Sequence, residues 1–95
     1  MAEIELFRDT NFKGGSIVLN GDAKNLKDFG FTDVLSSLKV RSGTFTLFQD
    51  QDFGGFSMTV SPRGGPNSDG QYPSQQSIGG RGDSISSVKL NSPEG

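Results

Sequence analysis

Hydrophobic and polar residues alternate along several short stretches of the chain. The stretches are residues 3–6, 37–41, 44–48, 57–60 and 87–90, and residues 16–19 follow the pattern only loosely. Alternation with a period of two is typical of β-strands that bury one face. Asn20-Gly21 and Ser42-Gly43 are turn signals between such stretches. The pattern predicts an all-β protein of about eight short strands, arranged as two antiparallel four-stranded sheets packed face to face.

One segment departs from the period of two. Residues 23–29 predict one or two helical turns, with Asp22 as the N-cap and Leu26 and Phe29 on the apolar face. Gly30 follows as the residue that ends the helix, because glycine readily adopts the left-handed conformation required there. We expect at most this one short helix.

The chain contains an internal duplication in two blocks. Residues 6–16 align with 47–57 at an offset of 41, and residues 32–40 align with 82–90 at an offset of 50. Six of eleven and four of nine positions are identical, including Asp9 with Asp50, Ser37 with Ser87 and Lys39 with Lys89. The repeat predicts two Greek-key motifs, at about 3–42 and 43–91, in one domain spanning 1–95. The second copy carries about nine extra residues, which we place in a Pro-, Gly- and Ser-rich loop at about 61–82.

Composition removes several classes of function. The 95 residues include no His and no Cys, which excludes Ser-His and Cys-His catalysis, disulfides, and metal sites built on thiolate or imidazole. Asp50 and Asp52 are paired acids, but so small a sandwich offers no obvious cleft for acid-base chemistry. We therefore expect no enzyme.

Charge and hydropathy restrict the partners. A net charge of -2 argues against nucleic acid, and no apolar run approaches the length of a membrane-spanning helix. The first residues lack a charged region followed by an apolar one, so no signal peptide is visible. We expect a cytoplasmic protein if the chain is complete, and an extracellular one is possible if it is a fragment. We also expect a monomer.

Two motifs, each present twice, carry a family resemblance. The spacing aromatic-x4-aromatic-x-Gly occurs as Phe7, Phe12 and Gly14 and again as Phe48, Phe53 and Gly55. The pattern (Asn/Asp)-(Asn/Asp)-x-x-(Ser/Thr)-Ser is matched, apart from its first position, by residues 32–37 and 82–87. Together they resemble a βγ-crystallin domain, of the single-domain kind found in microbes and invertebrates. The resemblance implies a Greek-key β-sandwich and calcium binding.

The chemistry of the second motif suits calcium. Ca²⁺ is a hard cation that takes six to eight oxygen ligands. In the family, the motif gives a side chain, a backbone carbonyl and a hydroxyl that reaches across to the other motif's site, and a hairpin carbonyl completes each shell. The resemblance thus implies two Ca²⁺ per chain and these ligands: Asp33, Val34, Ser36, Asp83, Ser84 and Ser86, with carbonyls from Thr10 and Gln51. The last serines, Ser37 and Ser87, are expected to make structural hydrogen bonds.

Two alternatives stay open. The domain could be a purely structural crystallin-type protein without metal, or a module that binds a protein or glycan through the loop at 61–82. Thr32 and Gly82 replace the acidic or amide residue at the motif's first position, which reduces the charge available to a metal. Ser36 and Ser86 are retained, whereas family members that lost the metal often carry a basic residue there.

Overall fold

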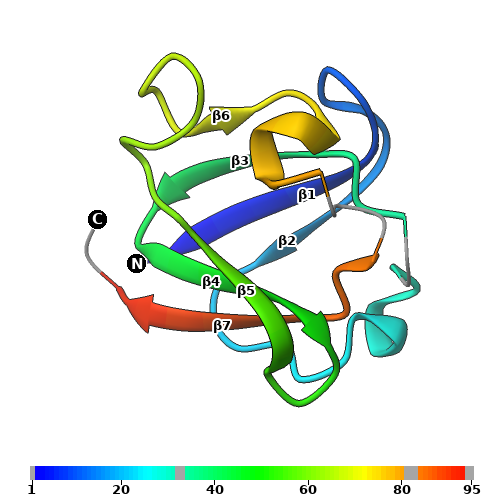
Figure 1. Cartoon of the computed structure of the whole chain (residues 1–95). Coiled ribbons are helices and arrows are strands. Elements are labelled where there is room, and N and C mark those ends of the chain that lie inside the picture. The colour runs from blue at the N-terminus through cyan, green and yellow to red at the C-terminus, as the bar shows by residue number, and fades with distance from the viewer. Residues whose placement is uncertain (1, 32–33, 81–83, 94–95) are drawn as a thin grey trace.

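The computed structural model describes residues 2–31, 34–80 and 84–93, and it contains two antiparallel sheets (Figure 1). The first sheet has the spatial order β2 (Lys13–Leu19), β1 (Glu3–Asp9), β3 (Ser37–Ser42) and β6 (Gln71–Tyr72). The second has the order β5 (Gly54–Val60), β4 (Thr44–Asp50) and β7 (Ser87–Ser92). The all-β sandwich predicted from the alternating pattern is confirmed.

The second sheet differs from the prediction of four strands. Three strands are present in its described part, and the fourth position is taken by a single bridge between Ala23 and Val88. The bridge is closed by hydrogen bonds in both directions, from Ala23 N to Val88 O at 2.7 Å and from Val88 N to Ala23 O at 2.9 Å. One bridged residue is too little to form a strand, because the chain turns into a helix directly afterwards.

Each sheet takes a segment from the other repeat. The strand β6 belongs to the second repeat but pairs with β3 of the first, in the register Leu38 with Tyr72. Ala23 belongs to the first repeat but bridges to β7 of the second. The two Greek keys therefore exchange their third segments, and neither sheet is built from one repeat alone.

The core lies between the sheets. Strand alternation turns one side chain in two inward, and the fully buried residues include Ile4, Leu6, Leu38, Phe45, Leu47 and Val88. None of the described helices is long and apolar enough to span a membrane.

Two short 3-10 helices lie in the described part of the chain. The first, η1, spans Leu26–Phe29 and is followed by Gly30 at a φ of 69°, as predicted. The prediction of its N-cap was wrong: Asn25 caps the helix, because the bridge at Ala23 keeps the preceding chain extended. Asp22 instead accepts a hydrogen bond from the backbone N of Leu90, with its Oδ1, at 2.7 Å.

The apolar face of η1 was predicted only in part. Leu26 is fully buried, but Phe29 is 46% exposed. Phe31, two residues further on, is fully buried and takes the place in the core expected for Phe29.

The described part of the predicted loop, residues 61–80, is more ordered than its composition predicts. It contains β6 and a second 3-10 helix, η2 (Gln75–Ile78), which ends at Gly79 with a φ of 78°. Gly30 and Gly79 are 49 positions apart, and both follow a four-residue helix, so η2 is the counterpart of η1. Most of the additional residues therefore lie before β6.

The additional residues are packed tightly against the first sheet. A Cβ on Gly70 would lie 2.5 Å from the carbonyl oxygen of Val40, and one on Gly64 would lie 2.0 Å from the hydroxyl of Tyr72. That hydroxyl accepts a hydrogen bond from Ser61 N at 3.3 Å. Burial raises the pKa of Tyr72, and the bond from Ser61 only partly offsets this.

Candidate metal centre

The hairpin β1–β2 turns through a run of left-handed residues. Asn11 and Phe12 have φ values of 61° and 63°, and Gly14 follows at 75°. A Cβ on Gly14 would lie 2.6 Å from Oδ2 of Asp9, so a larger residue would have to displace that carboxylate as well as adopt a left-handed conformation. The hairpin β4–β5 repeats the geometry at Asp52, Phe53 and Gly55, with φ values of 58°, 61° and 76°.

A buried serine fixes each hairpin from the neighbouring strand. The hydroxyl of Ser37 donates to the carbonyl of Asp9 at 2.6 Å and accepts from the backbone N of Phe12 at 3.0 Å. Ser87 makes the same two bonds to Asp50 O, at 2.5 Å, and Phe53 N, at 3.0 Å. The structural role predicted for the last serine of each motif is confirmed.

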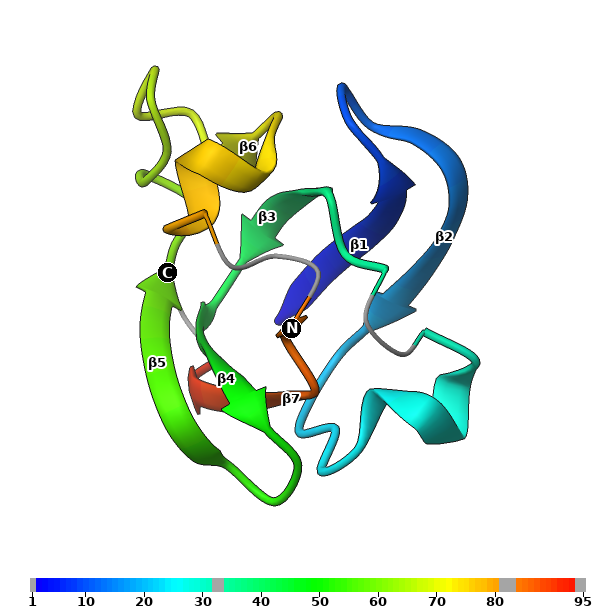
Figure 2. The ribbon, with the colours of Figure 1, turned by 45° about the vertical axis from the view of Figure 1, so that its right-hand side comes forward.

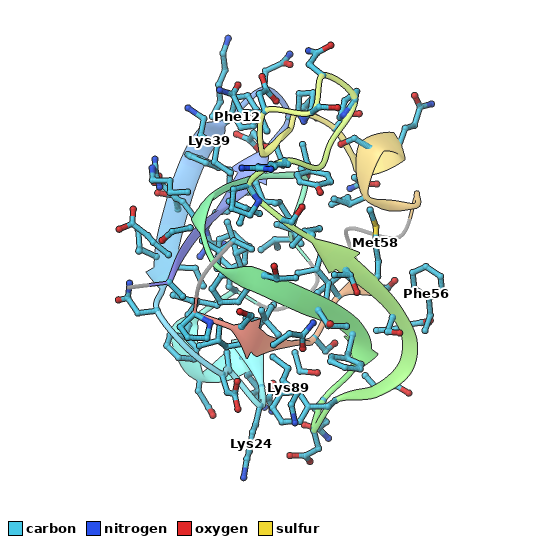
Figure 3. All side chains as sticks on the ribbon, turned by 90° about the vertical axis from the view of Figure 1, so that its left-hand side faces the viewer. Phe12, Lys24, Lys39, Phe56, Met58 and Lys89 are labelled. Carbon is cyan, nitrogen blue, oxygen red and sulfur yellow. The ribbon has the colours of Figure 1, made fainter. Side chains whose placement is uncertain are left out.

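Aromatic and cationic side chains cover the outside of the hairpins. The rings of Phe7 and Phe12 lie 5.7 Å apart, edge to face, and Nζ of Lys39 lies 4.6 Å from the ring centre of Phe12 (Figure 3). In the other hairpin Lys89 lies 5.2 Å from the ring centre of Phe53. Such contacts stiffen both turns. The two turns lie at opposite ends of the molecule (Figure 2).

The tip of β4–β5 is docked on the segment that leads into η1. The backbone N of Asp52 donates to the carbonyl of Lys24 at 2.7 Å, and the side-chain amide of Asn25 donates to Oε1 of Gln51 at 2.8 Å. Asn25 also accepts a bond from the backbone N of Lys27 at 3.0 Å, as the cap of the helix. One asparagine therefore links the hairpin of the second repeat to the helix of the first.

Ser86 lies between the same two repeats. Its backbone N donates to Phe48 O at 2.9 Å, and its carbonyl accepts from Leu26 N at 2.8 Å. Its hydroxyl is directed to the carbonyl of Ser84 at 3.4 Å, a long contact that leaves the oxygen available to another partner.

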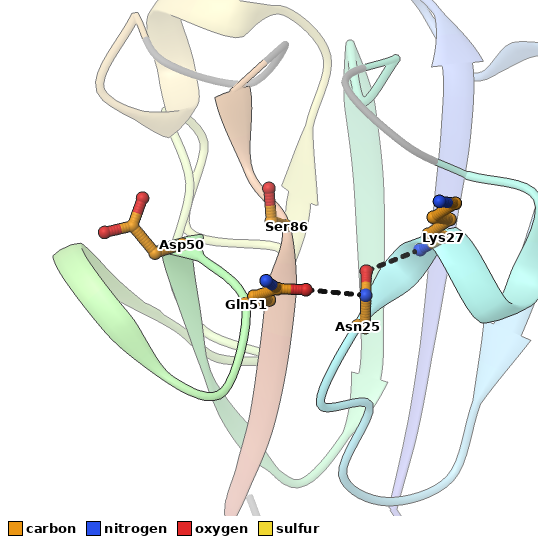
Figure 4. Close-up of a pocket in the computed structure, with 5 residues that line it drawn as sticks. All are labelled: Asn25, Lys27, Asp50, Gln51 and Ser86. Carbon is orange, nitrogen blue, oxygen red and sulfur yellow. Dashed lines mark hydrogen bonds between the residues drawn. The ribbon is translucent and has the colours of Figure 1, made fainter.

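These contacts surround a cavity of about 370 Å³. Its lining residues are Asn25, Lys27, Asp50, Gln51 and Ser86 (Figure 4). Gln51 and Ser86 are two of the predicted calcium ligands, from opposite ends of the second repeat. The fold brings them together beside the helix of the first repeat.

Thr10 and Ser36 are the counterparts of Gln51 and Ser86, and equivalent backbone bonds hold their segments on the other side of the molecule. The backbone N of Ser36 donates to Phe7 O at 3.0 Å, as that of Ser86 does to Phe48 O, and Asn11 N donates to Pro73 O at 2.8 Å. Among the described residues no hydrogen bond joins Thr10 to Ser36. Val34 is half-buried and packs against the core.

The two predicted carboxylate ligands, Asp33 and Asp83, lie outside the described residues. Within the ranges 2–31, 34–80 and 84–93, no three acidic, histidine or cysteine residues gather closely enough to hold a metal ion. A site in that part of the chain would rest mainly on neutral oxygens. The donors around the cavity, a hydroxyl, amides, carbonyls and one carboxylate, are hard ligands that suit Ca²⁺ rather than a thiophilic metal.

Sequence reasoning missed three of the residues that line the cavity. Asn25 could have been found as an N-cap directly before the apolar Leu26. Asp50 was recognised only as an identical position of the repeat and as a neighbour of Asp52. Lys27 carried no signal, because an isolated lysine on a predicted helix is ordinarily a solvated side chain.

Comparison with known proteins places the chain in a family. The Beta/Gamma crystallin model matches residues 3–90. A beta/gamma-crystallin from Ciona intestinalis is 39% identical over 89 residues, which are 94% of this chain and 98% of that protein.

Solved structures agree with the sequence match. A βγ-crystallin from Ciona intestinalis superimposes with a TM-score of 0.83 at 37% identity, over 94% of this chain and 99% of that one. A βγ-crystallin from an archaeon superimposes with a TM-score of 0.79 at 30% identity, over 94% and 96%. The resemblance inferred from the doubled motifs is confirmed, and the chain belongs to the β/γ-crystallin family.

Proposed function

We propose that this domain binds two Ca²⁺ ions and that the ions stabilise its fold. The observation that carries the proposal is the cavity lined by Gln51 and Ser86. The family pattern predicts that a hairpin carbonyl and a motif hydroxyl serve the same ion, and these two residues come from segments 35 positions apart in the sequence. The first proposed site consists of Asp33, Val34, Gln51 and Ser86.

The second proposed site follows from the repeat. It consists of Asp83, Ser84, Thr10 and Ser36, the counterparts of the first set. The equivalent backbone bonds of Ser36 and Ser86 support this, because they give both serines the same backbone position relative to their hairpins. Each set contains one carboxylate, so we expect dissociation constants of about 10⁻⁵ to 10⁻³ M.

Binding should stabilise the folded state by linkage. A ligand that binds only the folded chain adds about 2.7 kcal/mol per site at a hundredfold excess over its dissociation constant. Two sites would add roughly 5 kcal/mol, and the thermal midpoint should rise by about 10 °C or more after a discount for incomplete saturation.

The test is calorimetric titration of chelator-treated protein with Ca²⁺, followed by thermal unfolding with and without millimolar Ca²⁺. We expect two ions per chain and the rise in midpoint given above. Asp33→Ala and Asp83→Ala should each weaken one site strongly. Asp69→Asn is the control, because Oδ1 of Asp69 accepts only a local bond from Gln71 N and an amide oxygen can do the same.

The opposite result has a clear meaning. If folded, calcium-free protein takes up no Ca²⁺, or if both aspartate variants bind like the parent, the motifs serve folding alone. The domain would then be the purely structural crystallin-type protein.

A further inference from the structure

Among the described residues that line the Gln51 and Ser86 cavity, one differs in charge from its counterpart in the other repeat. Gln51 corresponds to Thr10, Ser86 to Ser36, and Asp50 to Asp9 at the repeat offsets of 41 and 50. The acid is present in both repeats, and the other two pairs are neutral. On the helices, whose offset is 49, Lys27 of η1 corresponds to the neutral Gln76 of η2.

Among the described residues that line the Gln51 and Ser86 cavity, Lys27 is the one cation. Its position is fixed at the backbone, where its N–H donates to Oδ1 of Asn25, and its side chain is exposed (Figure 4). In the described part of the chain the ion pairs join Arg41 to Glu3 and Glu5, and none neutralises Lys27.

We propose that Lys27 makes the two sites unequal, so that the site of Gln51 and Ser86 binds Ca²⁺ more weakly than the site of Thr10 and Ser36. The inference rests on the proposed function. The ammonium group repels a divalent cation and competes with it for the carboxylate of Asp50, which lines the cavity.

The expected size follows from the exposure of the lysine. Coulomb's law gives the scale: a unit charge about 8 Å from a divalent ion in a water-like dielectric changes the affinity for that ion by about three- to tenfold. Salt screens an exposed charge, so the difference between the sites should shrink as the ionic strength rises.

Other charges near η1 also differ between the repeats. Lys24, Asp28 and Asp52 correspond to Pro73, Ser77 and Asn11, and none of the three lines the cavity. Lys24 is directed away from the molecule (Figure 3), so it reports the effect of charge near the helix but outside the cavity.

The experiment compares the full-length parent with Lys27→Gln, Gln76→Lys and the control Lys24→Gln by calorimetric titration with Ca²⁺ at 0.05 and 0.5 M KCl. The set is repeated in an Asp83→Ala background, which isolates the Gln51 and Ser86 site. Circular dichroism before each titration checks that every variant is folded.

We expect Lys27→Gln to tighten the weaker site about three- to tenfold at low salt and by less at high salt. Gln76→Lys should weaken the stronger site by a similar factor, and Lys24→Gln should change either constant by less than about twofold. The inference is overturned if Lys27→Gln leaves both constants within twofold, or if Lys24→Gln has the same effect.

The two proposals fail in different ways. A parent that binds two ions while Lys27→Gln changes nothing removes this inference and leaves the proposed function in place. A parent that binds no Ca²⁺ removes both.

Discussion

The two repeats match closely in their hairpins and differ in the segments that follow. In each hairpin a buried serine bonds the same carbonyl and the same amide, and the same glycine packs against the same aspartate. After the hairpin, the first repeat reaches its bridging residue, Ala23, four residues beyond β2, whereas the second inserts additional residues before β6. The parts that every copy needs in order to turn the chain are retained, and the copies diverge where the chain crosses between sheets.

The first experiment tests the main difference between the repeats. It removes the packing of the inserted segment against the first sheet. Gly70→Ala should lower the free energy of unfolding by about 2–4 kcal/mol, because its φ is +79° and its Cβ would lie 2.5 Å from Val40 O and 2.8 Å from Pro62 O. Urea denaturation measures the loss. Gly21→Ala, in the corresponding connection of the first repeat, is the control, since a Cβ there meets no atom within 4 Å. Equal stability of the two variants would show that the insertion is not part of the folded unit.

The second experiment tests whether the two hairpins are as similar in their contribution to stability as they are in geometry. Ser37→Ala and Ser87→Ala should each lower the free energy of unfolding by about 1–3 kcal/mol, because each leaves a buried carbonyl and amide without their partner. The two losses should agree within about 0.5 kcal/mol in chemical denaturation, and the exposed Ser57→Ala should change stability by less than that. A large difference between the two serines would mean that the hairpins are alike in geometry but not in energy.

The smallest expected effect is a loss of stability at acidic pH, and it involves only the first sheet. Burial would raise the pKa of Glu5, but hydrogen bonds from Ser16 and Arg41, with the charges of Arg41 and Lys39, lower it below its ordinary value. The folded state therefore favours the ionised carboxylate, and this contribution is present near neutral pH and lost as the pH falls below about 4. The counterpart of Glu5 is the neutral Thr46, which bonds to Asn91.

Glu5→Gln tests that contribution. The stability difference between parent and variant in urea denaturation should be largest at pH 7 and should shrink toward pH 3. A difference that does not change with pH would show that the hydrogen bonds of the side chain matter and its charge does not. Thr46→Val should give a difference independent of pH.

Local signals explain what could be predicted from the sequence. Phe12, Gly14 and Ser37 belong to short motifs that occur twice, and the conformation of a tight turn is decided by residues within it. The pairing of Tyr72 with Leu38 could not be predicted, because partners 34 positions apart are chosen by the packed sheets and not by local propensity. Composition was misleading for the predicted loop, because Pro, Gly and Ser of its described part, 61–80, form ordered turns against the first sheet.

The residues of the candidate site also fall into two groups, those that local motifs predicted and those that were missed. Gln51 and Ser86 were named from motifs and meet at one cavity, whereas Lys27 and Asn25 were missed because their roles depend on how η1 meets the opposite hairpin. Their importance becomes visible only when the two repeats are docked.

The exchange of third segments has a consequence for the rate at which the domain folds. Hairpins such as β1–β2 close in microseconds because their partners are near in sequence. Much longer loops are closed by the bridge between Ala23 and Val88 and by the pairing of Leu38 with Tyr72. The chain loses the entropy of these loops before the contacts add stability, which slows their formation. Since each sheet contains a segment from the other half, we expect both sheets to be completed in one late, slow step, without accumulation of a half-folded molecule that has one finished sheet.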